Sequence, residues 1–372
     1  MKVRSLQLKY FKKFSDRSFE FTDKETGLAQ NLVVLIGANG SGKTTILQAI
    51  AATLGQAIGQ LKNLQDLDWP GFNYELMSSN WGRFEPEVNL EIQFSLQELK
   101  AIQEFYEKVA AYKNYLQPPA HNHLVNLKWH DGRVQANTAA ELFQFKGRQY
   151  AKQLMRSEGN RVFEKVGGIL WYIEQRTSTS LTPEKNSTDS NLEESQESES
   201  IEIDEDELRG ILASWQQFAS FIKTNNKPFP VANQKFLGEA KKFAELNRLY
   251  NLVFPGRRFE TLFPRENIND ITKKPWFYLF NKNENKHYEI SEMSAGERAI
   301  LPILIDFVNW NIHNSVILID ELELHLHPPL QQTLLGVLPS LGKNNQFIIT
   351  THSDYVAELV PEENIYFLED EL

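Results

Sequence analysis

The segment from Gly37 to Thr44 constrains the fold of this chain more than any other feature. Its letters, GANGSGKT, fit the pattern GxxxxGK[ST], with an apolar run at 32–36 before it and a segment rich in Ala, Ile and Leu after it. The run of branched apolar residues predicts a strand buried on both faces, and the following segment predicts a helix. A glycine-rich loop between a strand and a helix offers backbone N–H groups to phosphate. The sequence therefore predicts an α/β fold with a phosphate-binding loop.

The residue types in this loop suit a nucleotide and Mg²⁺. Glycines let the backbone close around a β-phosphate, Lys43 spans the β- and γ-phosphate oxygens, and the Thr44 hydroxyl ligates Mg²⁺. The alternative is an ordinary glycine-rich turn, which the predicted strand and helix on either side disfavour.

A second predicted strand ends in two acids. Residues 316–319 are branched and apolar, and Asp320 and Glu321 follow them. Ligand sites of parallel α/β sheets lie at the carboxyl ends of strands, where Asp320 would hold Mg²⁺ through a water and Glu321 would accept a proton from the attacking water. Alone, such a pair is as often a surface turn. Lys43 and Asp320 lie 277 positions apart, so either a large insertion splits one nucleotide-binding fold or the pairing is accidental.

Two more segments offer groups to phosphate. Residues 291–298, SEMSAGER, which we call the signature turn, precede an apolar helix whose N-terminus is a phosphate receptor. The structural alternative is an N-cap at Ser294 with Glu297 completing a capping box, and both interpretations can hold together. Pro302 should kink the helix or shorten its first segment. His352 follows a predicted strand and is placed to reach a γ-phosphate, although a histidine in that position is more often structural.

The rest of the chain divides by hydrophobic periodicity and composition. Between 177 and 207 it has hardly any apolar residues, which predicts a disordered loop or linker. The alternation of helices and strands after Ser291 favours a parallel sheet. Further strands are expected at 3–8, 88–94, 169–173, 347–350 and 365–368, and helices at 96–115, 208–223, 232–254 and 329–338.

Composition excludes several classes of protein. The formal net charge of −10 comes entirely from residues 184–207, which hold 11 acids and one lysine and leave 38 basic against 38 acidic residues elsewhere. The overall acidity therefore does not exclude a nucleic-acid partner. With no cysteine, disulfides, thiolate metal sites and cysteine nucleophiles are excluded. No apolar run approaches the length of a membrane span, so we expect no membrane association and a cytoplasmic location.

Together, these motifs resemble the ATP-binding-cassette ATPases, in the AAA-type SMC, RecF and OLD-like branch where a long insertion splits the cassette. The resemblance covers residues 1–50 and 285–372. It implies a two-lobed α/β ATPase head, with a mainly parallel sheet, an antiparallel N-terminal sheet and a mainly helical insertion, and with ATP and Mg²⁺ as ligands. The implied domains are an N-terminal lobe at 1–175, an acidic linker at 176–207, an insertion at 208–284 and a C-terminal lobe at 285–372.

The resemblance also implies the site residues. Gln175 is the candidate Q-loop glutamine, although Gln93 also follows a predicted strand. Lys12, in YFKKF, takes the place of a basic residue that approaches ATP in related proteins, with a solvated basic turn as the alternative. The implied catalytic residues are Lys43, Glu321 and His352, and the implied Mg²⁺ ligands are Thr44, Asp320 and Gln175. The implied ATP contacts are Lys12, Gly37, Asn39, Gly40, Ser41, Gly42, Lys43, Thr44, Thr45, Gln175, Ser294, Gly296 and Glu297.

The letters that begin at the paired acids, DELELHLHP at 320–328, resemble the DEPELHLHP segment of OLD-like ATPases, with Leu322 in place of proline. His325 and His327 form one H-x-H pair without further spaced ligands, which favours an intersubunit loop over a metal site.

The resemblance further implies how such a chain works. Ser294 and Gly296 of one subunit would contact the γ-phosphate held by another, in a head-to-tail homodimer or a higher oligomer. The implied function is an ATPase that controls a separate effector, a nuclease or toxin, in anti-phage defence. The alternative is an ATP-dependent DNA clamp or scaffold with negligible turnover, as in RecF-like repair or maintenance proteins.

Two other observations bear on partners. Basic pairs at 241–242, 257–258 and 273–274 leave nucleic-acid binding open, although such pairs are more often solvated faces. A transporter ATPase is disfavoured by the 277-residue separation of Lys43 and Asp320 and by the SAGE letters of the signature turn.

Overall fold

The computed structural model describes residues 1–63, 66–73, 85–112, 117–173, 211–212, 215, 234–260 and 278–368. Their contacts divide the chain into two units, each built from separate stretches of sequence. The first unit takes residues 1–200, 310–324 and 338–372, and the second takes 201–309 and 325–337. The signature turn therefore groups with the insertion. Gln175, the linker at 176–207, Lys273 and Lys274, and most of the helix expected at 208–223 lie outside the described residues.

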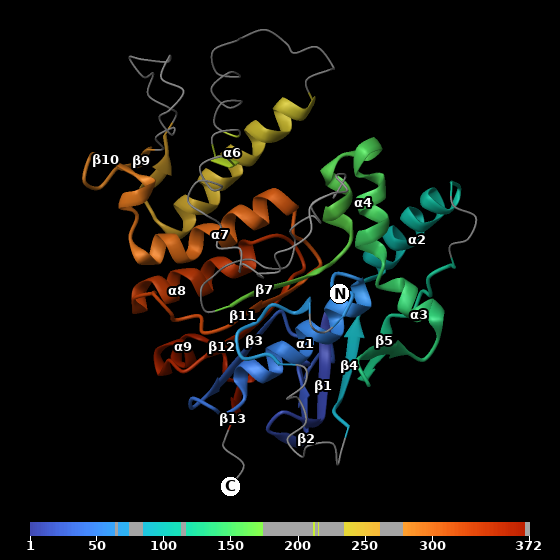
Figure 1. Ribbon diagram of the computed structural model, residues 1–372. Helices are drawn as coiled ribbons and strands as arrows, with labels where there is room; N and C mark the ends of the chain where they lie inside the picture. The colour runs from blue at the N-terminus through green and yellow to red at the C-terminus, as the bar shows by residue number, and fades with distance from the viewer. Residues whose placement is uncertain are drawn as a thin grey trace, which may run out of the picture. The chain divides into compact units, whose positions relative to one another are not determined.

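The first unit contains two five-stranded sheets, and one of them is antiparallel with the order β2-β1-β4-β5-β6 (Figure 1). Its strands are β1 (Lys2–Phe11), β2 (Phe14–Glu20), β4 (Glu87–Gln93), β5 (Leu124–His130) and β6 (Arg133–Ala136). Buried residues alternate with more exposed ones along β4 and β5, as expected of strands with one face in the core. The predicted antiparallel N-terminal sheet is confirmed.

The other sheet of the first unit is parallel, with the order β13-β3-β12-β11-β7. Its strands are β3 (Leu32–Gly37), β7 (Ile169–Tyr172), β11 (Val316–Ile319), β12 (Gln346–Thr351) and β13 (Ile365–Leu368). Every residue of β7, β11 and β12 is buried, which explains the continuous apolar sequences of β7 and β11, while β12 also buries the polar residues Gln346, Thr350 and Thr351. Because β12 pairs with β3 on one side and β11 on the other, the two distant parts of the chain form one sheet.

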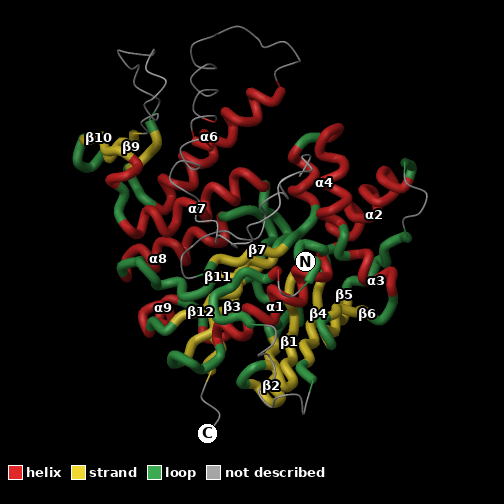
Figure 2. Tube along the Cα trace, in the orientation of Figure 1, coloured by secondary structure: helices red, strands yellow, loops and turns green. Residues whose placement is uncertain are grey.

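Helix α1 (Lys43–Ile58) follows the phosphate loop and contacts strands of both sheets, so it is buried on nearly all sides. Figure 2 shows this helix between the two sheets. Of the other helices, α2 (Leu96–Ala110) follows β4, and α3 (Ala139–Gln144) and α4 (Gly147–Glu158) follow β6. Helix α9 (Asp354–Leu359) follows β12. In the part of the chain that the structure describes, no helix is both long and apolar enough to cross a membrane.

The second unit combines helices with a small antiparallel sheet of order β10-β9-β8. The sheet comprises β8 (Arg257–Phe259), β9 (Tyr278–Asn281) and β10 (Lys286–Glu289). The helices are α6 (Gln234–Val253), α7 (Ala295–Trp310, whose last residue groups with the first unit) and α8 (Pro328–Val337).

Helix α7 continues through Pro302, so the expectation that this proline shortens the first segment is wrong. Proline removes one N–H and normally interrupts a helix. Here Ile300, Leu301, Ile303 and Leu304 are all buried, and this apolar packing on both sides of Pro302 outweighs the lost hydrogen bond.

Candidate nucleotide-binding site

Glycines give the phosphate loop a backbone that other residues would not tolerate. Gly40 and Gly42 have φ angles of +82° and +100°, in the left-handed region. A Cβ atom on Gly42 would lie 2.5 Å from the ring of Phe14. The loop therefore packs closely against the start of β2, and its path depends on these two glycines.

Some polar groups of the phosphate loop bond within the loop, and another has no hydrogen-bond partner in the described part of the chain. The Lys43 ammonium turns back and donates to the carbonyl oxygens of Gly37 and Ala38, at 2.6 and 2.9 Å. The Ser41 hydroxyl is 2% exposed and has no hydrogen-bond partner among the described residues. The N-terminus of α1 has no side-chain cap. Because buried donors of this kind normally have partners, the loop fits a phosphate ligand.

Asp320 brings the two distant motifs into contact. The Thr44 hydroxyl donates to Asp320 Oδ1 at 3.1 Å, and the Thr350 hydroxyl donates to the same oxygen at 2.5 Å. Burial raises the pKa of Asp320, while hydrogen bonds from Thr350, Thr44 and Trp69 act in the opposite direction. A buried carboxylate beside a threonine hydroxyl is the donor set that suits Mg²⁺, so these residues fit the ion that the sequence implies.

Thr350 also holds the second acid. Its hydroxyl accepts from the backbone N–H of Glu321 at 2.8 Å, while it donates to Asp320. Glu321 has a left-handed backbone, with φ of 47°, which is uncommon for a residue with a side chain. Such backbone strain is maintained only when neighbouring groups hold it. One fully buried hydroxyl on β12 therefore fixes both acids at the end of β11.

His352 is held by an acid that the sequence analysis did not single out. Glu323 Oε1 accepts from His352 Nδ1 at 2.6 Å and from its backbone N–H at 2.7 Å. This pairing places the Nδ1 proton toward Glu323 and leaves Nε2 for another partner. Glu323 Oε2 is buried and has no hydrogen-bond partner among the described residues.

Lys43 lies in the field of three carboxylates. Burial lowers the pKa of its ammonium, and Glu321, Glu323 and Asp320 oppose this change. The site therefore contains one buried cation and several acids, which is the charge balance expected where a cation and a polyphosphate bind together.

The two lysines of YFKKF have different contacts. Lys12 donates to Gln48 Oε1 on α1 at 2.5 Å and to the carbonyl of Gly71 at 2.9 Å, and burial lowers its pKa. Lys13 donates to the carbonyl of Gly40 in the phosphate loop at 2.7 Å. Lys12, the residue predicted to approach ATP, is thus bound to α1 and to segment 66–73, while its neighbour contacts the loop.

The signature turn lies in the second unit and forms the predicted capping box. Ser294 donates through its backbone N–H and hydroxyl to Glu297 Oε2, at 3.0 and 2.8 Å, and the Glu297 N–H donates to the Ser294 hydroxyl at 3.3 Å. A Cβ on Gly296 would lie 2.6 Å from Leu330 Cδ2, so α8 packs directly on this glycine. Glu297 is 2% exposed, and its carboxylate faces the interior of the unit.

The structure therefore gathers most of the predicted site at one edge of the parallel sheet. The loop, the paired acids and His352 follow β3, β11 and β12, whose carboxyl ends meet there. β7 ends at Tyr172 beside β11 and leads into the segment that contains Gln175.

Of the other residues of the phosphate loop, Asn39 is exposed and Thr45 is half-buried. Trp69, Thr350 and Glu323 also belong to the site but are not predicted from the sequence. The repeated acid in DELE is a sequence signal for Glu323, whereas Trp69 has no such signal.

His325 and His327 remain candidates for an intersubunit loop. His325 is exposed and has a left-handed φ of 62°. Among the residues that the structure describes, no group of three or more His, Cys, Asp or Glu is placed to hold a metal ion.

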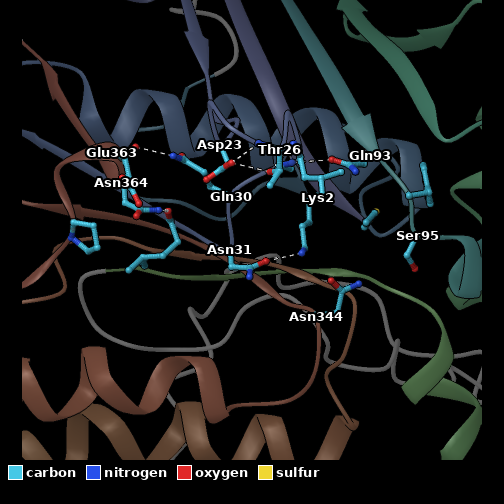
Figure 3. Close-up of a pocket in the computed structure, with 16 residues that line it drawn as sticks. Lys2, Asp23, Thr26, Gln30, Asn31, Gln93, Ser95, Asn344, Glu363 and Asn364 are labelled. Atoms are coloured by element: carbon cyan, nitrogen blue, oxygen red, sulfur yellow. Dashed lines mark hydrogen bonds between the residues drawn. The ribbon is translucent and has the colours of Figure 1, made fainter.

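A pocket of about 630 Å³ lies at the opposite edge of the parallel sheet, where the strands begin (Figure 3). Its side chains are already paired: Lys2 Nζ donates to Asn31 Oδ1 at 2.6 Å, and Gln30 Nε2 donates to the carbonyl of Glu363 at 2.6 Å. None of the unpartnered buried polar atoms found in the described residues lines it, so this pocket lacks the signs of a ligand site that mark the phosphate loop.

Two proteins of similar sequence are named as retron probable ATPases. The Retron Vc95 probable ATPase of Vibrio cholerae serotype O1 biovar El Tor is 22% identical over 410 aligned positions, which cover 100% of this chain and 74% of that protein. The Retron Ec83 probable ATPase of Escherichia coli is 34% identical over 111 residues, which cover 27% of this chain and 20% of that protein. Protein ea59 of Escherichia phage lambda is 33% identical over 107 residues, with 28% and 20% covered.

Solved structures give a weaker likeness. An SMC head bound to the C-terminal winged-helix domain of ScpA has a TM-score of 0.49 at 16% identity, over 98% of this chain and 96% of that one. The SMC head domain from Thermotoga maritima has a TM-score of 0.45 at 15% identity, over 99% and 94%. The two five-stranded sheets and the helices of the chain itself define its α/β fold.

A family model described as an AAA ATPase domain matches residues 1–357, nearly the whole chain. The matched range includes the phosphate loop, the paired acids, the signature turn and His352. The chain therefore belongs to the AAA ATPase domain family.

Proposed function

We propose that this protein binds and hydrolyses ATP in the cytoplasm, and that ATP joins two copies head to tail in a state that controls a separate effector. The observation that carries the proposal is the hydrogen bond from Thr44 to Asp320, 3.1 Å long between residues 276 positions apart. Two motifs that match by accident have no reason to meet in the fold. Their contact supports a single nucleotide site split by an insertion.

The chemistry follows from groups already in place. Lys43 and the N–H groups at the start of α1 would bind the phosphates. Glu321 would accept a proton from the attacking water, with Thr350 fixing its backbone. His352 would present Nε2, because Glu323 engages Nδ1. Thr44 and Asp320 would hold Mg²⁺, which supplies positive charge against the charge that develops on the phosphates.

The partner in this proposal is first a second copy of the chain. Ser294 and Gly296 would complete the ATP site of that copy, as the resemblance to the cassette ATPases implies. The effector, a nuclease or toxin in anti-phage defence, is supported by that resemblance and by the two relatives that are named as retron ATPases.

The test is the mass in solution of Glu321→Gln with and without Mg-ATP, beside phosphate release by the wild type. We expect ATP to double the mass of this variant and the wild type to release phosphate. Lys43→Ala in the same background controls for nucleotide binding, and Ser294→Arg controls for the shared site. Unchanged mass, together with full hydrolysis by Ser294→Arg, would reject the shared site in favour of a self-contained one.

Release measured with and without DNA tests the clamp alternative. ATP-driven assembly on DNA with no measurable phosphate release would favour the clamp over the hydrolytic switch.

A further inference from the structure

The carboxylate of Glu297 is the centre of a buried polar cluster in the second unit. Oε1 accepts from the Tyr250 hydroxyl at 2.5 Å, the Tyr288 hydroxyl at 2.6 Å and Arg257 Nη1 at 2.8 Å. Oε2 accepts from the backbone N–H and the hydroxyl of Ser294. We call these five residues the Glu297 cluster.

The two oxygens of Glu297 connect different parts of the chain. Oε2 bonds to the signature turn itself, through Ser294. Oε1 bonds to Tyr250 of α6 and Arg257 of β8, which lie about 40 residues earlier in the chain, and to Tyr288 of β10, the strand just before the turn. One side chain therefore ties the turn to the helix and sheet of the insertion. Leu330 of α8 packs against Gly296 on the same turn, so the turn has little freedom to shift alone.

The ionised state of the Glu297 carboxylate depends on the groups that bond to it. Burial alone would raise its pKa, but hydrogen bonds from Tyr250, Tyr288, Ser294 and Arg257 outweigh burial and lower the pKa to about 2. The carboxylate is thus ionised at neutral pH in a buried position, and Arg257 is the cation that pairs with it. Arg257 is 31% exposed and Glu297 is 2% exposed, so removing Arg257 would leave a buried carboxylate without its cation and destabilise the cluster.

We propose that the Glu297 cluster couples the signature turn to the insertion, so that Tyr250, Arg257 and Tyr288 position the turn for ATP-driven association with a second copy. This inference rests on the proposed function and names the side chains that hold the signature turn in place for that association. The three residues are positioning residues, since none of them needs to touch ATP. They act through Ser294, the residue assigned to the shared site.

The chain offers a matched control for this proposal. Arg257 and Arg258 are neighbours on β8, but Arg258 is 56% exposed and pairs with Glu260 instead of Glu297. Arg257→Gln and Arg258→Gln therefore make the same chemical change one residue apart. Tyr288→Phe is a milder variant, because it removes one hydroxyl from the cluster and leaves the ring.

The experiment uses the full chain in the Glu321→Gln background and measures two quantities. Binding of a fluorescent ATP analogue is titrated at protein concentrations too low for association, and ATP-dependent association is measured by sedimentation. We expect analogue affinity within about twofold of the parent for every variant, because the phosphate loop is unchanged. We expect Arg257→Gln to weaken association by about tenfold or more, Tyr288→Phe by a smaller factor, and Arg258→Gln to leave it unchanged.

Three results would overturn the coupling. The first is ATP-dependent association of Arg257→Gln as strong as that of the parent. If Arg257→Gln fails to fold, association of Tyr288→Phe as strong as that of the parent would overturn the coupling instead. Equal losses in Arg257→Gln and Arg258→Gln would assign the effect to charge on β8. Additive losses in Arg257→Gln with Glu297→Gln would contradict a shared cluster, whose members should be non-additive. If the Glu321→Gln parent does not self-associate when ATP is added, the proposed function itself is rejected. Failure of the proposed function is thus distinguishable from failure of the coupling.

Discussion

At the scale of single residues, the candidate nucleotide site depends on side chains that orient the proposed catalytic residues. Glu323 is 9% exposed and binds both the ring and the backbone of His352. We predict that Glu323→Ala lowers kcat for ATP hydrolysis by about tenfold or more, because a residue that orients a reacting group has effects of this size. KM should change little, since the substitution leaves Lys43 and the phosphate loop, the proposed phosphate contacts, unchanged.

Steady-state phosphate release across ATP concentrations checks this prediction. Glu358→Ala, an exposed glutamate on α9, is the matched control and should leave kcat unchanged. If Glu323→Ala keeps the wild-type kcat, the role of Glu323 in orienting His352 is wrong.

Gly42 tests the loop backbone. We predict that Gly42→Ala lowers the unfolding free energy by about 1–3 kcal/mol, because its φ of +100° is strained for alanine and the new Cβ would meet Phe14. Gly336→Ala on α8 is the control, since its Cβ meets no atom within 4 Å and alanine favours a helix by up to about 1 kcal/mol. Urea denaturation measures both, and a Gly42→Ala chain as stable as wild type would show that the loop adapts.

At the scale of elements, the start of α7 is held by the charge on Glu297. Its folded pKa of about 2 lies below the ordinary value of 4.5, so the carboxylate stabilises the fold above pH 4.5 and this contribution is lost as pH falls through 2. We predict that the difference in unfolding free energy between wild type and Glu297→Gln is largest above pH 4.5 and shrinks steadily below it.

Urea denaturation at a series of pH values measures that difference. Glu245→Gln, which breaks an exposed pair with Arg248, should change stability by less than about 1 kcal/mol throughout. A wild-type advantage over Glu297→Gln that stays constant down to pH 2.5 would contradict the assignment of the charge.

At the scale of the whole molecule, the candidate nucleotide site joins Thr44 to Asp320, which belong to two of the three stretches that form the first unit. A ligand that bridges the loop to Asp320 binds the folded chain and not the unfolded one. We therefore predict that Mg-ATP stabilises Glu321→Gln by about 2.7 kcal/mol at 100 times its Kd. Thermal denaturation with and without Mg-ATP measures this, Lys43→Ala should show no shift, and a shift that persists in Lys43→Ala would place the ligand elsewhere.

Local sequence patterns are enough to predict the strands of the parallel sheet and the loop between β3 and α1. All five strands of that sheet match their predicted ranges to within one residue at each end, because short apolar runs of this kind have few alternatives to a buried strand. The capping box at Ser294 was also local, since its two partners are three residues apart. Local sequence is sufficient where the interaction itself is local.

Which distant residues meet depends on how the strands and helices are arranged in the fold. The contact between Thr44 and Asp320 depends on β12 lying between β3 and β11, which no local pattern specifies. Trp69 reaches Asp320 from a segment with no strand or helix pattern, and Arg257, expected in a basic pair, turns inward to Glu297. These side chains find partners across the fold, because burying a charge is tolerated only where the surrounding elements supply its hydrogen bonds.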